Sequence, residues 1–182
     1  SENISDLTGI EDFTALIDLH CYNNQLTSFD VSNNTALTLL YCYDNQLTSL
    51  DVSQNTALAY LICSDSQLTA LDLSQNAMLS TLNCNKNQLT SLDVSNNTAL
   101  TTLDCSSNQL TTLDVRNGNN GNFSNFYVSN NLNLSCINVD DSVWSIANWI
   151  NIDPQHYFST NCPPPTAIQE HTTNKELLKV TD

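Results

Sequence analysis

Cysteine is the residue type of this chain with the widest possible chemistry, because a thiolate can bind a metal, attack a substrate or form a disulfide. The chain has seven cysteines, and five of them recur every 21 residues: Cys21, Cys42, Cys63, Cys84 and Cys105. None of the five belongs to a Cys-x-x-Cys pair, so the spacing does not indicate zinc. Adjacent thiols of a regular stack would run parallel, which makes the disulfide torsion near 90° hard to reach. We therefore predict a column of small, buried and unreactive side chains.

Histidine and glycine give no sign of a catalytic site. His20, His156 and His171 lie far apart in the sequence, and no Ser/His/Asp or Cys/His combination converges on them. With only 3 glycines, the chain has no Gly-rich loop for phosphate. General acid–base catalysis requires titratable groups that meet in one pocket. The sequence therefore predicts a non-enzymatic protein with no catalytic residue, no cofactor and no metal centre.

The elements that carry these residues follow from a unit that is written five times. Its second copy reads Leu37-x-x-Leu40-x-Cys42-x-x-Asn45-x-Leu47-x-x-Leu50-x-Val52-x-x-Asn55. Self-similarity at a fixed period predicts a solenoid, in which each coil packs against its neighbours. In both halves of the unit, apolar residues two positions apart have the strand period. We expect a mainly β repeat solenoid with short parallel strands on two sides of each coil and little helix.

Asparagine marks the turns of the unit. Its side chain tolerates turn conformations, and its amide can bond the backbone where the chain bends. One column consists of Asn24, Asn45, Asn87 and Asn108, with Ser66 in the third unit, and a second of Asn34, Asn55, Asn76 and Asn97. Stacked amides would pair buried turn groups that otherwise cost free energy.

This frame resembles the leucine-rich repeat family, and within it the bacterial 21-residue class called IRREKO, over about Leu16 to Val115. The segment from Ile4 to Leu19 is similar to an internalin-type leucine-rich repeat. The resemblance implies an N-terminal cap at residues 1–15 and five repeats at residues 16–118. A solenoid of this kind offers a long displayed surface, which favours binding over catalysis.

Beyond Val115 the frame is interrupted and then returns in aromatic form, as Phe123-x-x-Phe126-x-Val128. We interpret residues 119–162 as a degenerate repeat and a C-terminal cap, because terminal repeats must shield the end of the stack. Asp140-Asp141-Ser142 predicts the start of a short helix. The residues expected to cover the last coil are Trp144, Ile146, Trp149 and Ile150.

Cys136 and Cys162 lie outside the cysteine column, on either side of the expected cap. A disulfide between them would tie the cap to the last coil and would fit a secreted protein. The alternative is that all seven thiols stay reduced.

Residues 163–182 are interpreted as a linker and the start of a sorting tail. Consecutive prolines from Pro163 to Pro165 favour an extended linker. The stretch from Lys175 to Asp182 resembles the opening of the C-terminal sorting domain of the type IX secretion system of Bacteroidetes. That resemblance implies export to the cell surface or the medium.

The net charge of −15, from 19 acidic and 4 basic residues, argues against some partners. Nucleic acids and anionic membranes attract Lys and Arg, so neither is an expected partner. No apolar run approaches the roughly 20 residues of a membrane span, so we expect no membrane insertion. Ser1 does not open a signal peptide, and we expect a mature fragment of a secreted or cell-surface protein.

The outward positions of the second half of the unit hardly change from copy to copy. They include a column of carboxylates, namely Asp30, Asp51, Asp72, Asp93 and Asp114. Neighbouring carboxylates repel, so hydroxyls, turn N–H groups or cations must offset the repulsion. Bonds to the turns are the expected explanation, and a row of calcium sites is the alternative.

The outward positions of the first half vary, and in the first three units they are aromatic or apolar. We predict that they form the binding site, which consists of His20, Tyr22, Leu39, Tyr41, Tyr43, Tyr60 and Ile62, with Asp44 and Asp65 at the rim. Tyrosine supplies large, stiff and partly polar contact area, and exposed apolar clusters mark contact sites. The alternative is the ordinary strand preference of Tyr and Ile. The expected function is recognition of a protein partner, with glycan binding on the same face as the alternative.

Overall fold

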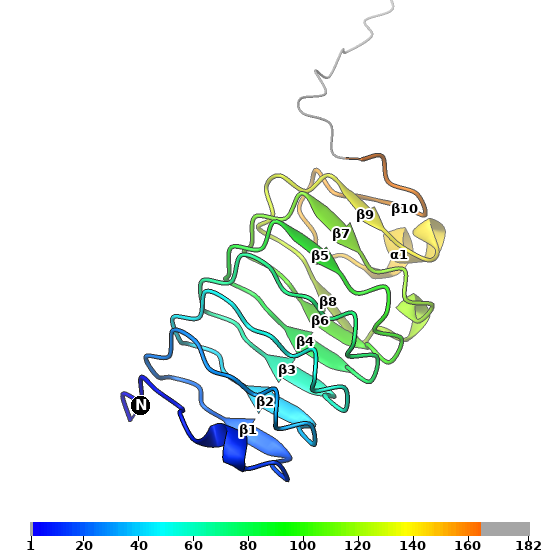
Figure 1. Ribbon diagram of the computed structural model, residues 1–182. Helices are drawn as coiled ribbons and strands as arrows, with labels where there is room; N and C mark the ends of the chain where they lie inside the picture. The colour runs from blue at the N-terminus through cyan, green and yellow to red at the C-terminus, as the bar shows by residue number, and fades with distance from the viewer. Residues whose placement is uncertain (1, 165–182) are drawn as a thin grey trace, which may run out of the picture.

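Successive units stack as coils of one solenoid in the computed structural model, which describes residues 2–164 (Figure 1). The first halves of the units form a parallel sheet of six strands, called sheet A here. Its strands are, in spatial order, β1 (Asp18–His20), β2 (Leu39–Tyr41), β3 (Tyr60–Ile62), β4 (Thr81–Asn83), β6 (Thr102–Asp104) and β8 (Asn125–Tyr127). Equivalent residues of successive units lie side by side, as Leu19 does with Leu40 and Leu40 with Leu61.

The second halves of the later units form sheet B, a parallel sheet of four strands on the other side of the stack (Figure 1). Its strands are β5 (Ser91–Asp93), β7 (Thr112–Asp114), β9 (Cys136–Asn138) and β10 (Tyr157–Ser159). Helical structure within residues 2–164 is limited to α1 (Ser142–Asn148) and the 3-10 turns η1 (Ile10–Asp12) and η2 (Asn120–Asn122). The predicted fold class, a mainly β parallel solenoid with little helix, is confirmed.

Sheet B does not extend to the first three units. Their equivalent segments, residues 28–30, 49–51 and 70–72, are not strands. Leu50 and Leu71 there are 9% and 8% exposed, whereas Leu92 of β5 is 2% exposed. Side-chain amides link the coils on this side, because Asn55 Nδ2 donates to the Val31 and Asn34 carbonyl oxygens of the preceding coil at 3.0 and 2.9 Å.

The inward side chains form one apolar core along the stack. The five cysteines of the 21-residue column are all buried and carry free thiols. Burial raises the pKa of the Cys21 and Cys63 thiols to about 12, and it holds the pKa of Cys84 well above its ordinary value. A raised pKa keeps a thiol protonated and makes it a poor nucleophile. The predicted column of small, buried side chains is confirmed.

The first column of asparagines pairs turn groups of two coils at once. Asn45 Nδ2 donates to the carbonyl oxygens of Cys42 and Cys21, both at 3.0 Å, and Asn45 Oδ1 accepts a bond from the Leu26 N–H at 3.0 Å. The same pattern recurs at Asn87, Asn108 and Asn131. These bonds satisfy buried backbone groups that a bending chain would otherwise leave unpaired.

Helix α1 begins after Asp141, whose carboxylate accepts bonds from the Val143 and Trp144 N–H groups at 2.9 and 3.0 Å. Ser145 and Trp149 are buried, so the predicted role of Trp149 in covering the last coil is confirmed. Trp144 is half-buried.

The same prediction is wrong for Ile146 and Ile150, which are 66% and 81% exposed. The reason is helical geometry. Ser145 and Trp149 are four residues apart and share the inward face. Ile146 is one position after Ser145, which turns its side chain by about a quarter of the circumference, toward solvent. Ile150 lies beyond the end of α1, in an exposed segment of chain that is not helical.

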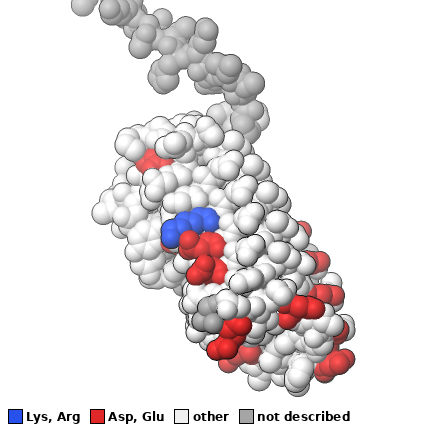
Figure 2. Space-filling model, turned by 90° about the vertical axis from the view of Figure 1, so that its left-hand side faces the viewer, with Lys and Arg blue, Asp and Glu red and all other residues white. Residues whose placement is uncertain are grey.

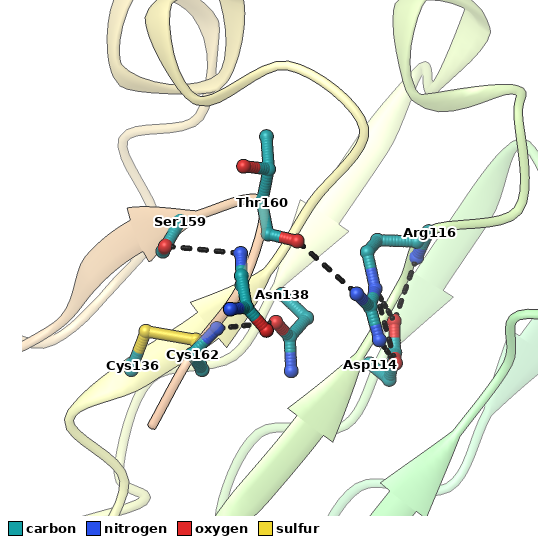
Figure 3. Close-up of a disulfide and its surroundings, with 8 residues drawn as sticks. Asp114, Arg116, Cys136, Asn138, Ser159, Thr160 and Cys162 are labelled. Atoms are coloured by element: carbon teal, nitrogen blue, oxygen red, sulfur yellow. Dashed lines mark hydrogen bonds and ion pairs between the residues drawn. A yellow bond between two sulfur atoms is a disulfide. The ribbon is translucent and has the colours of Figure 1, made fainter. Parts of the chain in front are cut away.

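The predicted disulfide between Cys136 and Cys162 is confirmed, with the two Cα atoms 5.7 Å apart. Figure 3 shows that two further interactions hold the segment after β10 beside sheet B. The Cys162 N–H donates to Asn138 Oδ1 at 2.7 Å, and Arg116 Nη1 donates to the Thr160 carbonyl oxygen at 3.1 Å. The disulfide thus fastens the C-terminal end of the described chain to β9.

The gap in the first asparagine column gives a stability prediction. Ser66 Oγ is buried without a partner, and serine cannot accept the Leu47 N–H as Asn45 accepts that of Leu26. The Ser66→Asn variant should raise the free energy of unfolding by about 1–3 kcal/mol, because it restores those bonds. Denaturant unfolding measures the change, with Ser66→Ala as the control. A Ser66→Asn protein no more stable than Ser66→Ala would contradict this account of the column.

The disulfide gives a second prediction. It closes a loop of 26 residues, so its removal in a Cys136→Ser, Cys162→Ser variant should cost about 3 kcal/mol. Because solenoid repeats interact with their neighbours only, the loss should be local. Hydrogen exchange should accelerate in β9 and β10 and stay unchanged in β1 to β3. Equal acceleration throughout sheet A would show instead that the stack unfolds as one unit.

Candidate functional site

The structure places the predicted site residues on the outward surface of sheet A, over its first three strands. Outward positions lie in register, so Leu39 pairs with Tyr60, and Tyr41 lies between His20 and Ile62. The strand positions alternate strictly, with the leucine between each pair buried. Tyr22 and Tyr43 lie two residues after the ends of β1 and β2. These seven residues are called the tyrosine face below: His20, Tyr22, Leu39, Tyr41, Tyr43, Tyr60 and Ile62.

Rings of the tyrosine face contact one another between coils. Tyr22 and Tyr43 are stacked, with ring centroids 4.6 Å apart and planes inclined by 4°. His20 meets Tyr41 edge to face, with ring centroids 4.9 Å apart. Such ring pairs are favourable beyond the area they bury. The rings are therefore held in place before any partner binds.

The tyrosine face is only partly shielded from water. Tyr22 and Tyr60 are 37% and 44% exposed, while Leu39, Tyr41 and Tyr43 are half-buried. The exposed surface is therefore apolar and aromatic, with phenol hydroxyls at its outer limit. This combination is typical of contact surfaces.

The predicted rim residues lie at the turn that follows each strand. Asp44 and Asp65 have positive φ values of 54° and 50°, a conformation that aspartate adopts more readily than most residues. Asp65 pairs with Lys86 Nζ at 3.0 Å. Figure 2 shows one basic patch on its face of the molecule, in contact with acidic side chains, while the other charged atoms in view are acidic.

The equivalent surface of the later units is polar and internally bonded. Asn85 Nδ2 donates to Asp104 Oδ2 at 2.8 Å, and the Ser106 hydroxyl donates to Asp104 Oδ1 at 2.6 Å. Asn83 Oδ1 accepts the Asn85 N–H at 3.1 Å. Because these groups already bond one another, they gain less from a partner than the tyrosine face does.

Sequence reasoning missed Tyr127 of β8. It lies in register with Asp104, at the outward position that His20 and Tyr41 occupy in the first units, and it is 38% exposed. The signal was present in the frame Phe123-x-x-Phe126-x-Val128, because the residue between Phe126 and Val128 must point outward. Sheet A therefore carries aromatic side chains at both ends of its outward surface.

The carboxylates of the aspartate column, in the second half of each unit, accept hydrogen bonds from backbone N–H groups of the turns. Asp30, Asp51 and Asp72 each accept the backbone N–H of the serine two residues later, at 2.8 to 2.9 Å. These N–H bonds, helped by the serine hydroxyls, hold the pKa of each carboxyl below its ordinary value. Within residues 2–164, no group of three His, Cys, Asp or Glu side chains is placed to hold a metal ion. The expected turn bonding of the column is confirmed.

No protein-family model matches this chain, and no curated protein matches it. Solved structures do. The functional domain of InlJ from Listeria monocytogenes, which includes a cysteine ladder, is 32% identical with a TM-score of 0.66, over 75% of this chain and 33% of that chain. The chain has a leucine-rich repeat fold. Its own column of five buried cysteines is similar to the cysteine ladder of InlJ.

Two further structures support the leucine-rich repeat fold. The internalin InlF from Listeria monocytogenes is 21% identical with a TM-score of 0.60, over 83% of this chain and 50% of that chain. A leucine-rich repeat protein of Leptospira interrogans is 21% identical with a TM-score of 0.57, over 82% of this chain and 44% of that chain. The chain spans between a third and a half of the length of these proteins.

Among residues 2–164, no helix has the length and apolarity that a membrane crossing requires. The stretch from Lys175 to Asp182, which the sequence analysis assigned to a sorting tail, lies outside the described residues.

The aspartate column predicts a defined acid sensitivity of the fold. A carboxyl whose pKa is lower in the folded than in the unfolded chain stabilises the fold above its unfolded pKa of about 3.9, and the contribution is lost as pH falls through the folded-state pKa. The melting temperature should therefore drop as the pH is lowered from about 5 to about 3. Circular dichroism measures this drop.

In the triple variant Asp30→Asn, Asp51→Asn, Asp72→Asn the drop should be smaller, because asparagine keeps an acceptor oxygen that does not titrate. The matched control is Asp18→Asn, which removes a carboxylate from sheet A and leaves the column intact. A triple variant with the same pH dependence as the control would refute the role of the column.

Proposed function

We propose that this protein is a non-enzymatic binding module that recognises a protein partner through the tyrosine face. The observation that carries the proposal is the contact of aromatic rings between coils, with Tyr22 stacked on Tyr43 at 4.6 Å and His20 against Tyr41 at 4.9 Å. The leucine-rich repeat fold of the similar structures supports a protein-interaction role.

Ring contacts of this kind lower the entropic cost of binding. Immobilising a flexible side chain at an interface costs about 0.5–1.5 kcal/mol. Tyrosines that are already stacked on one another have less freedom to lose. Tyrosine is also among the residues that contribute most to the free energy of binding in protein interfaces. The tyrosine face therefore offers a pre-organised centre for an interface.

Charge favours a basic partner. Asp44 borders the tyrosine face, where Asp65 is already paired with Lys86, and the chain as a whole has a net charge of −15. Complementary charge at the rim of an interface raises the association rate and makes it sensitive to salt. We expect binding that weakens with ionic strength, mainly through slower association.

We further propose that the protein is secreted or displayed at the cell surface. The disulfide between Cys136 and Cys162 supports this, because such bonds persist in oxidising compartments. The assignment of the repeats to the IRREKO class, and of residues 163–182 to a linker and a type IX sorting tail, belongs to the same proposal.

The test is a double variant, Tyr41→Ala with Tyr43→Ala. It removes one ring from each of the two contacting pairs. The immobilised protein is used to capture partners from extracellular protein fractions, and the captured partner is titrated by surface plasmon resonance. The double variant should bind at least tenfold more weakly, since each lost anchor is worth about 1–2 kcal/mol or more.

Tyr157→Ala is the matched control, because Tyr157 is an exposed tyrosine of sheet B, at 49%. It should leave binding unchanged, and circular dichroism should show that both variants keep the fold. A double variant that binds as well as the control would exclude the tyrosine face as the binding site. A glycan array signal that disappears in the double variant would favour the glycan alternative on the same face.

A further inference from the structure

A cavity of about 230 Å³ lies at the C-terminal end of sheet A, far along the stack from the tyrosine face. It lies between β8, the last strand of sheet A, and the segment from Asn148 to Asn151 that follows helix α1. This cavity is called the cap pocket below. None of the residues assigned to the proposed binding face contributes to its lining.

Aromatic rings line the inner part of the cap pocket. Phe126 and Trp149 are buried and stacked, with ring centroids 3.9 Å apart. Trp144 stands edge to face against Trp149 at 5.8 Å, and Phe123 lies 5.4 Å from Trp149. Trp144 and Phe123 are half-buried, so part of this aromatic surface faces the pocket opening.

Amides and hydroxyls form the outer part. Asn125, Tyr127 and Asn148 are exposed lining residues, as is Asn151. Tyr127 Oη donates to Asn125 Oδ1 at 3.3 Å, and Asn148 Nδ2 donates to the Trp144 carbonyl oxygen at 2.7 Å. Each amide has two protons and one carbonyl oxygen, so these bonds use only part of its capacity.

One buried polar atom of the pocket lining has no bond within the described chain. The indole Nε1–H of Trp149 is buried and has no acceptor. A buried donor without an acceptor costs about 1–3 kcal/mol. The ring of Trp149 lines the pocket, so the signal of its N–H can report on a ligand bound there.

All residues that line the cap pocket are uncharged, in a chain with 19 acidic side chains. An ionic ligand would find no counter-charge there and would lose its hydration, which is costly. The pocket therefore selects neutral ligands. Its volume lies below the roughly 300–1,000 Å³ of pockets for drug-sized molecules, so it fits one small ring.

An extended peptide is a poorer fit than a ring. β8 is the edge strand of sheet A, and such an edge could in principle pair with an added strand. However, the Val128 N–H at the end of β8 already donates to the Asn151 carbonyl oxygen at 3.2 Å. The edge is therefore closed where a longer strand would have to continue.

We propose that the cap pocket binds a neutral sugar ring. One face of a pyranose carries C–H groups that pack on aromatic rings, and its hydroxyls both donate and accept. The half-buried ring of Trp144 supplies the apolar contact. Asn125, Asn148 and Tyr127 bond the hydroxyls. The site is independent of the protein-binding role proposed for the tyrosine face.

The test uses nuclear magnetic resonance on the whole chain. The two tryptophans give two indole N–H signals, which report directly on Trp144 and Trp149. The probes are methyl β-glucopyranoside, methyl β-galactopyranoside and N-acetylglucosamine. At least one should shift both signals with a Kd on the order of 1 mM. Glucuronate and glucosamine, which are charged, should bind about tenfold more weakly or not at all.

Asn148→Ala should weaken binding of the active sugar about tenfold, and Trp144→Ala should abolish it. Val143→Ala is the matched control on the same helix, because Val143 is 77% exposed and does not line the pocket. It should bind the sugar normally, as should the Tyr41→Ala, Tyr43→Ala protein. Unshifted indole signals with every neutral sugar would overturn the proposal, as would normal binding by Asn148→Ala and a folded Trp144→Ala protein.

Two sources could supply the ring, a free monosaccharide or the terminal unit of a glycan. Lactose and cellobiose distinguish them. If the pocket serves a glycan, a disaccharide binds at least as tightly as its monosaccharide, since the second ring extends past the pocket opening. If it serves a free sugar, the disaccharide binds more weakly.

Discussion

The whole stack depends on pairing the backbone groups at its turns. A chain that bends twice in 21 residues brings carbonyl and N–H groups of every turn into the interior, where water cannot bond them. The side chain of Asn45 pairs such groups, because it forms hydrogen bonds to two carbonyl oxygens and one N–H, in its own coil and the preceding one. Because each amide joins two coils, the spacing of the stack and the closure of the turn are set by the same side chain.

The structural roles of the individual positions explain where the sequence can vary for function. Inward leucines, cysteines and turn asparagines are fixed by packing and pairing, and the aspartate column is committed to turn N–H groups. The outward positions of sheet A in the first three coils take no part in this packing or turn pairing. Aromatic residues gather there in the first three coils, and polar residues that bond one another follow in the later ones. The binding face is thus a property of positions that the scaffold does not need.

Local periodicity made much of this predictable, since a residue such as Leu40 or Asn55 has the same environment in every coil. The disulfide between Cys136 and Cys162 was also predicted from the sequence. Prediction failed where the outcome depends on how neighbouring coils approach each other or on the orientation of a short helix. The start of sheet B at Ser91 and the exposure of Ile146 to solvent were not predicted. The cap pocket was not predicted because Tyr127 and Asn148 come together only through the packing of the cap.

The uneven extent of the two sheets has a mechanical consequence. From β5 onward, backbone hydrogen bonds join the coils in both sheets, one on each side of the stack. In the first three coils only sheet A joins the backbones as strands, while amide side chains link the opposite side. Fewer strand-to-strand backbone bonds therefore join that half of the solenoid. The tyrosine face lies on the part of the stack that has only one of the two sheets, whereas the cap pocket lies at the end where both sheets are present.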